Sequence, residues 1–180
     1  DRNAANHVPL SPLSFLARTA LVYPTRKALI YGAFSQDWHT TYSRCRRLAS
    51  ALASRGIGVG DTVAVMLPNV PAMFEAHFGV PMCGAVLNAL NTRLDAQAIA
   101  FALQHAEARV LLTDREFAPV VGKALALLGD ARPLVVEVED ATAPAGEWLG
   151  EIGYEDLLAE GDSEFAWQLP ADERDAIALN

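Results

Sequence analysis

Cysteine is scarce in this sequence, which has two in 180 residues and no Cys-x-x-Cys pair. Cys45 and Cys83 stand far apart along the chain, each among apolar neighbours. This pattern predicts reduced cysteines that pack as small hydrophobic side chains, rather than a disulfide or a catalytic thiol. Because reduced cysteines persist in reducing compartments, we expect a cytoplasmic protein.

Long hydrophobic runs are lacking too. No stretch approaches the roughly 18 uninterrupted apolar residues of a transmembrane helix, so we expect no membrane span. No signal-like apolar region follows the polar residues 1–3, so nothing supports secretion. The first residue is not methionine, and we expect the natural chain to begin further upstream.

Positive charge is in deficit, with 14 Lys and Arg residues against 22 Asp and Glu residues and a formal net charge of −8. This balance disfavours nucleic acids and anionic membranes as partners. Apolar residues make up 52% of the chain, which is typical of a folded protein, and 180 residues are enough to build one domain with a real core.

The motifs of several enzyme classes are absent. The sequence has no G-x-x-x-x-G-K-[ST], no G-x-G-x-x-G and no G-x-S-x-G, which argues against a P-loop enzyme, a dinucleotide-dependent oxidoreductase and a triad hydrolase. The glycines of 56–60 follow a predicted helix and precede a predicted strand, so we interpret them as a turn. The four histidines are scattered, and the acidic residues cluster in predicted loops, so we predict neither a metal site nor a carboxylate pair.

The first third of the chain predicts two helices around a hairpin. A capped amphipathic helix begins after Ser11-Pro12 and closes at Tyr23-Pro24, and strands at 28–31 and 37–40 pair as a hairpin. Thr41 is expected to cap the next helix, which ends at Gly56. We place the arginines of this helix largely on its polar side: Arg44, Arg46, Arg47 and Arg55.

From residue 63 onward apolar strands alternate with helices, which is typical of βαβ units. This predicts an α/β fold class, with layered βαβ units and a mostly parallel sheet covered on both faces. An apolar run at 177–179 predicts a last, buried strand. The expected strands are 63–67, 84–90, 109–113 and 134–138, and the expected helices are 69–83, 95–106 (with Ile99, Phe101, Ala102 and Leu103 on its apolar side), 117–128 and 154–159.

Only one residue is a candidate for a binding site. His77 stands among Phe74, Phe78 and Met82, so it either packs in the core or lines a substrate pocket. Glu75 is two positions away and would point in another direction on a helix. From the residues alone, the chain is an α/β scaffold without a chemical centre.

Four segments carry a resemblance to a known family. These are Thr41-Tyr42 opening a helix, Gly58–Asn69 (GVGDTVAVMLPN), Phe74–Asp95 (FEAHFGVPMCGAVLNALNTRLD) and Glu107–Asp114 (EARVLLTD). In order and spacing they resemble the N-terminal portion of adenylate-forming acyl-CoA synthetases of the AMP-binding superfamily. The sequence of the third segment from His77 to Asp95 is similar to the branch with bacterial medium-chain fatty acyl-CoA ligases and plant acyl-activating enzymes.

The resemblance implies an acid–thiol ligase that joins a carboxylic acid to CoA through an acyl-adenylate, with ATP and Mg2+, within fatty acid metabolism. It also implies that the full-length protein is cytoplasmic and can form a homodimer. The family's catalytic motifs are absent between Asp1 and Asn180, so no catalytic or cofactor-binding residue can be assigned here, and the ATP, Mg2+ and CoA sites are expected beyond Asn180. We therefore expect residues 1–180 to be the N-terminal part of the large AMP-binding domain, ending before the phosphate-binding loop and inactive alone.

Two alternatives stay open from the sequence. One is another adenylate-forming enzyme, such as an amino-acid adenylation domain or a luciferase-like oxygenase. The other is a non-catalytic α/β module that binds a partner or small molecule, which would be stable alone and expose no large apolar patch.

Overall fold

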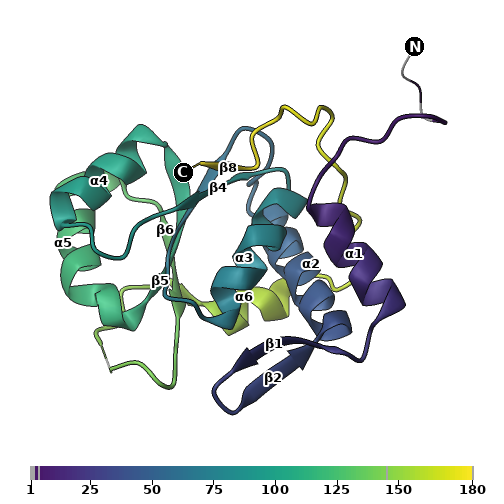
Figure 1. Cartoon of the computed structure of the whole chain (residues 1–180). Coiled ribbons are helices and arrows are strands. Elements are labelled where there is room, and N and C mark those ends of the chain that lie inside the picture. The colour runs from purple at the N-terminus through teal and green to yellow at the C-terminus, as the bar shows by residue number, and fades with distance from the viewer. Residues whose placement is uncertain (1–2, 4, 145, 180) are drawn as a thin grey trace.

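A six-stranded parallel sheet forms the centre of the computed structural model, which describes all residues except 1–2, 4, 145 and 180 (Figure 1). Every pair of neighbouring strands in this sheet runs parallel, which confirms the predicted α/β fold. Its strands, in spatial order, are β7 (Ile152–Gly153), β6 (Leu134–Val138), β5 (Ala108–Asp114), β3 (Thr62–Met66), β4 (Val86–Ala89) and β8 (Ala178–Leu179).

Helices cover both faces of the sheet, and each face has its own hydrophobic core. One core joins the sheet to α2 (Trp38–Ser54), α3 (Pro71–Met82) and α6 (Tyr154–Glu160). The other joins it to α4 (Ala96–His105) and α5 (Ala118–Leu128). The remaining helices are α1 (Leu13–Val22), which packs on α2 and α3, and the short 3-10 turns η1 (Arg115–Phe117) and η2 (Gly129–Ala131).

The strand order reverses direction at β3, which is a topological switch point of the sheet. All five residues of β3 are buried, as expected for a central strand covered on both faces. From β3 the chain moves to β4 on one side and then crosses to β5 on the other side. In open α/β sheets, ligands bind outside the carboxyl ends of the strands at such a reversal. The carboxyl end of β3 is therefore the place to look for a site.

The predicted hairpin is present, but its second strand was placed too late. Strands β1 (Lys27–Tyr31) and β2 (Phe34–Asp37) pair antiparallel, and residues 38–40 already belong to α2. The reason is the cap: Asp37 Oδ1 accepts a hydrogen bond from Thr40 N at 2.8 Å, so the helix begins there. Thr41 is not the cap; it lies buried inside α2, and its hydroxyl donates to the Asp37 carbonyl oxygen at 2.7 Å.

Helix α2 ends just before Gly56, as predicted, and the structure shows that it ends in a Schellman motif. Gly56 has a φ of +73°, which only glycine adopts without strain, and its N–H donates to the Ala53 carbonyl oxygen at 2.9 Å. The N–H of Ile57 donates to the Leu52 carbonyl oxygen at 3.1 Å. This confirms the interpretation of 56–60 as a helix-to-strand turn.

Two predictions of burial were wrong. Phe101 was placed on the apolar side of α4, but it is 66% exposed and stacks on His105, with ring centroids 5.3 Å apart. Of the run at 177–179, only Ala178 and Leu179 form a strand, β8, and both are exposed, because β8 is short and lies at the edge of the sheet beside β4.

The two cysteines behave as predicted. Both are free thiols, Cys45 buried and Cys83 partly buried. Burial raises the pKa of the Cys83 thiol to about 11, so it is not poised as a nucleophile. Among the described helices, none is long and apolar enough to cross a membrane.

Candidate functional site

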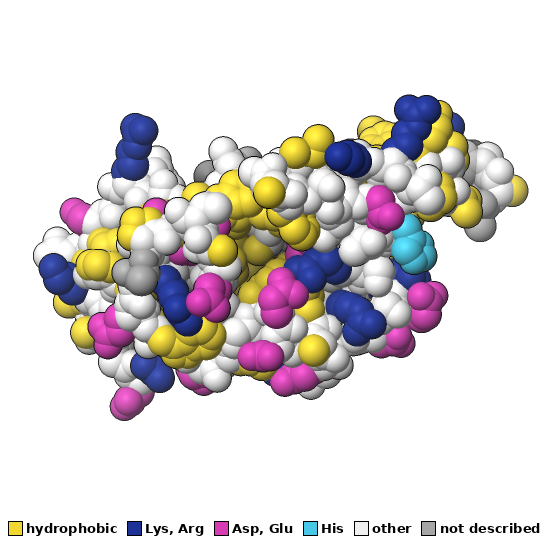
Figure 2. Space-filling view, turned by 90° about the horizontal axis from the view of Figure 1, so that it is seen from below, with side chains coloured by type: hydrophobic (Ala, Val, Ile, Leu, Met, Phe, Trp, Pro, Cys, Tyr) yellow, Lys and Arg dark blue, Asp and Glu magenta, His cyan; other side chains and the backbone are white. Residues whose placement is uncertain are grey.

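Two adjoining grooves lie at the carboxyl edge of the sheet, next to the β1–β2 hairpin. Figure 2 shows this face from below, with a hollow lined by hydrophobic side chains and bordered by acidic and basic ones. The apolar groove, of about 490 Å³, lies between β1 and the first turns of α3. The mixed groove, of about 920 Å³, is lined also by the segment after β6 and by the start of α6. Both grooves share Tyr31, Val70 and Pro71.

The apolar groove is shaped by the start of α3. Pro71 occupies the first position of this helix, where its fixed φ suits a helix and its missing N–H costs nothing. Phe74 and Phe78 follow one turn apart and line the groove, with ring centroids separated by 5.1 Å. Leu29 and Ile30 of β1 supply further wall residues. The groove therefore offers mainly carbon surface to a ligand.

His77 lies on the wall of the apolar groove. Its side chain is exposed, and its Nδ1 lies 2.7 Å from the Met73 carbonyl oxygen one turn earlier in α3. The exposure contradicts the interpretation of His77 as a core packing residue. Glu75, by contrast, points away from His77 into the protein, as the spacing on a helix predicted.

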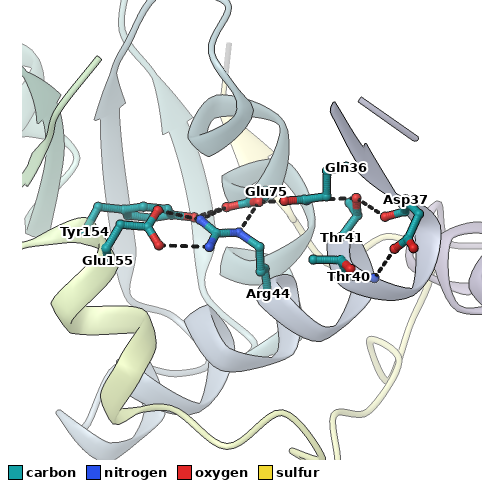
Figure 3. Close-up of polar contacts among 8 residues, drawn as sticks. All are labelled: Gln36, Asp37, Thr40, Thr41, Arg44, Glu75, Tyr154 and Glu155. Carbon is teal, nitrogen blue, oxygen red and sulfur yellow. Dashed lines mark hydrogen bonds and ion pairs between the residues drawn. The ribbon is translucent and has the colours of Figure 1, made fainter. Parts of the chain in front are cut away.

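The buried carboxylate of Glu75 is the centre of a polar network that the sequence did not reveal (Figure 3). Its Oε1 accepts hydrogen bonds from Arg44 Nε at 2.6 Å and from Gln36 Nε2 at 3.1 Å. Its Oε2 accepts from the Tyr154 hydroxyl at 2.8 Å and from Arg44 Nη2 at 3.2 Å. A fully buried carboxylate is stable only when its oxygens are satisfied in this way.

Arg44 joins this network to α6. Its Nη1 and Nη2 donate to the two carboxylate oxygens of Glu155, at 2.8 and 2.6 Å, in a bidentate pair. Burial lowers the pKa of Arg44, but the hydrogen bonds to Glu155 and Glu75 outweigh it and raise the pKa above its ordinary value. The prediction placed Arg44 on the polar side of α2 with the other arginines, but its guanidinium contacts the fully buried carboxylate of Glu75.

Tyr154 keeps its proton in this environment. Burial, followed by the charge of Glu75, raises the pKa of the Tyr154 hydroxyl well above its ordinary value. The hydroxyl therefore acts as a hydrogen-bond donor to Glu75. Gln36 belongs to β2, so its hydrogen bond to Glu75 connects the hairpin to the network. Its Nε2 also donates to Thr41 Oγ1 of α2 at 2.9 Å.

The only sequence signal for this network was an acidic residue inside an otherwise apolar predicted helix. Glu75 lies at the centre of α3, between Ala72, Ala76 and Gly79, which are all buried. Such a residue requires a partner from elsewhere in the fold, but nothing in the sequence identifies that partner as Arg44 or Tyr154. The assignment of acidic residues to loops alone was therefore incomplete.

A second polar contact closes the mixed groove on its other side. The Tyr31 hydroxyl of β1 donates to Asp140 Oδ2 at 2.5 Å and lies 2.9 Å from Thr142 Oγ1. The hairpin is thus tied to the loop after β6. Within the described part of the chain, no group of three or more His, Cys, Asp or Glu residues is arranged to hold a metal ion.

The family described as AMP-binding enzyme matches residues 16–175. The chain belongs to this family. It is 51% identical to the peroxisomal acetate/butyrate--CoA ligase AAE7 of Arabidopsis thaliana, over 97% of this chain and 33% of that protein. It is 46% identical to the acetate--CoA ligase CCL3 of Humulus lupulus, over 99% of this chain and 33% of that protein. The resemblance to the AMP-binding superfamily is confirmed.

The fold of this AMP-binding family member recurs in solved ligase structures. The anthranilate CoA ligase AuaEII, solved with anthranoyl-AMP, superposes with a TM-score of 0.85 at 18% identity, over all of this chain and 33% of that one. A benzoate CoA ligase from Burkholderia xenovorans LB400 superposes with a TM-score of 0.68 at 22% identity, over 83% of this chain and 28% of that one. The chain spans about a third of the length of the proteins it matches.

Proposed function

We propose that this chain is the N-terminal part of the large domain of an ATP-dependent acyl-CoA ligase. The observation that carries the proposal is the family match over residues 16–175, together with 51% identity to a named CoA ligase. In the proposed reaction a carboxylate oxygen attacks the α-phosphorus of ATP and pyrophosphate leaves. The CoA thiol then attacks the acyl carbon and AMP leaves. We propose that ATP, Mg2+ and CoA bind to parts of the ligase beyond Asn180.

We propose that the acid is a small carboxylic acid with an apolar tail, and that the apolar groove forms one wall of its pocket. The groove supports this because Leu29, Ile30, Met73, Phe74 and Phe78 present carbon surface to it. The names of the relatives cover acetate, butyrate, 2-methylpropanoate and benzoate, so a role in fatty acid metabolism is the narrower form of this proposal.

The full-length protein tests the proposal directly. Incubated with ATP, Mg2+, CoA and a ladder of straight-chain, branched and aromatic acids, it should release AMP and pyrophosphate and form the acyl-CoA of at least one acid. The 180-residue chain alone should show no acid-dependent exchange of pyrophosphate into ATP. If the full-length protein forms an acyl-CoA from none of these acids in the presence of CoA, the proposal is contradicted.

His77 is proposed to contact the acid. In the full-length ligase, His77→Ala should raise the KM for the acid about three- to tenfold and leave the KM for ATP unchanged, because one wall contact is lost. Its melting temperature should hardly change, since the side chain is exposed. His105→Ala is the matched control, because His105 is exposed on α4 over the other face of the sheet. Equal kinetic effects of both changes would argue against a role for His77.

The cell compartment and the oligomeric state of the full-length protein are further parts of this proposal. The free cysteines support the reducing cytoplasm, whereas AAE7 is named as peroxisomal. Fluorescence microscopy of a tagged full-length protein distinguishes the two compartments. We propose a homodimer on the basis of the family resemblance alone, and light scattering of the full-length protein measures its mass.

A further inference from the structure

We propose that Glu75 is a positioning residue whose buried carboxylate holds the walls of both grooves in place, and thereby sets the affinity for the acid. This inference rests on the proposed ligase function. Figure 3 shows the arrangement that carries it: side chains from β2, α2 and α6 converge on one carboxylate of α3. Glu75 itself lines neither groove, so it acts only through its partners.

Each partner of Glu75 belongs to a groove wall. Gln36, Arg44 and Tyr154 all line the mixed groove, and all three donate hydrogen bonds to Glu75. Helix α3, which carries Glu75, also lines the apolar groove, through Phe74 and Phe78. A change at Glu75 is therefore expected to affect the walls of both grooves.

The hairpin depends on this network because it is poorly packed. The exposed residues of β1 and β2 outnumber the buried ones, and Gln36 is the buried residue of β2. An isolated two-stranded hairpin is marginally stable in water, so its position must come from ties to the body of the protein. Gln36 provides such a tie through Glu75 and Thr41, and Tyr31 provides another through Asp140.

The charge balance of the network also points to positioning. Arg44 is shared by two carboxylates, those of Glu75 and Glu155, so the cluster carries one net negative charge beside the mixed groove. A buried ion pair is often no more stabilising than well-packed apolar side chains of the same volume. What the carboxylate supplies beyond stability is a fixed geometry, since its four hydrogen bonds allow few orientations of the elements that donate them.

Conservative variants of the full-length protein test the inference. Glu75→Gln keeps the shape of the side chain, and Tyr154→Phe removes one hydroxyl and nothing else. Tyr42→Phe is the matched control, because the Tyr42 hydroxyl accepts a hydrogen bond of the same 2.8 Å length from Trp167 Nε1, and Tyr42 lines neither groove. The readouts are the KM for the acid, the KM for ATP, kcat, the melting temperature and amide hydrogen exchange of residues 27–37.

We expect Glu75→Gln and Tyr154→Phe to raise the KM for the acid about three- to tenfold, with the KM for ATP and kcat nearly unchanged. Hairpin amides should exchange about tenfold faster, while those of α4 and α5 keep their rates. Tyr42→Phe should leave the KM and the hairpin rates unchanged. If both variants lower the melting temperature yet match Tyr42→Phe in KM and exchange, the role is structural only and the inference is overturned.

The two proposals fail separately. If the unmodified full-length protein forms no acyl-CoA, the ligase function is contradicted, and hydrogen exchange still decides the positioning role. Unchanged exchange of the hairpin amides in Glu75→Gln overturns the positioning role whatever the enzyme's activity.

Discussion

Replacing Glu75 with leucine is expected to lower the free energy of unfolding of this chain by about 3–5 kcal/mol. Leucine removes one of the two ion pairs of Arg44 and leaves the buried Tyr154 hydroxyl without an acceptor. The Gln36 amide loses one of its two acceptors and keeps Thr41 Oγ1. Each buried polar group that loses its partner costs the chain its desolvation energy. Urea unfolding of the variant and the unmodified chain, followed by circular dichroism, measures the difference.

A surface ion pair serves as the control for this change. Glu151 pairs with Arg132 at 3.6 Å, and both side chains are about half exposed. Glu151→Leu should therefore change the free energy of unfolding by less than about 1 kcal/mol. Adding Arg44→Leu to Glu75→Leu should cost less than the sum of the two single changes, because the two residues share one interaction. A loss at Glu75 no larger than that at Glu151 would show that the network contributes little to stability.

Gly79→Ala is expected to destabilise the chain by about 1–3 kcal/mol through overpacking. Gly79 is where α3 packs on α2, and an added Cβ would lie 2.7 Å from Leu48 Cδ2 and 3.0 Å from the Cys45 carbonyl oxygen. Leu48 is fully buried in the core, so it has little room to move away, and the backbone oxygen of Cys45 would move only with α2 itself. The same urea titration detects the loss.

Gly122→Ala is the matched control for Gly79→Ala, since Gly122 also lies inside a helix, α5. A Cβ there would meet only Leu149, at 3.7 Å, which is ordinary contact. Alanine favours the helix over glycine by roughly 1 kcal/mol, so this change should be neutral or stabilising. Opposite signs for the two substitutions are the expected result. Equal destabilisation would mean that the packing of α3 on α2 is not the cause.

Much of the fold could be predicted because it depends on local pattern. The buried run of β3 and the alternation of strands with helices are readable as periodicity, and they predicted the parallel sheet. The error at the end of the hairpin arose where two local signals competed. Asp37 and Thr41 are both good helix caps, and the choice of Asp37 shifted the end of β2 by three residues.

The groove was predictable only in part. His77 was singled out because aromatic residues surround it in the sequence, and the structure places it beside Phe74 and Phe78 on the groove wall. The opposite wall, Leu29 and Ile30 of β1, is more than forty positions earlier in the chain. No periodicity within one segment contains information on such a distant contact.

The sequence by itself determined the alternation of strands and helices, the reduced state expected of its cysteines and the likeness to AMP-binding enzymes. These follow from composition, hydrophobic periodicity and short sequence motifs. Only the tertiary structure decided that Glu75 is buried, that Arg44 turns inward and that Tyr154 completes the network. The physical reason is that a charged side chain enters a core only where distant elements supply its hydrogen bonds, and those elements meet only when the chain has folded.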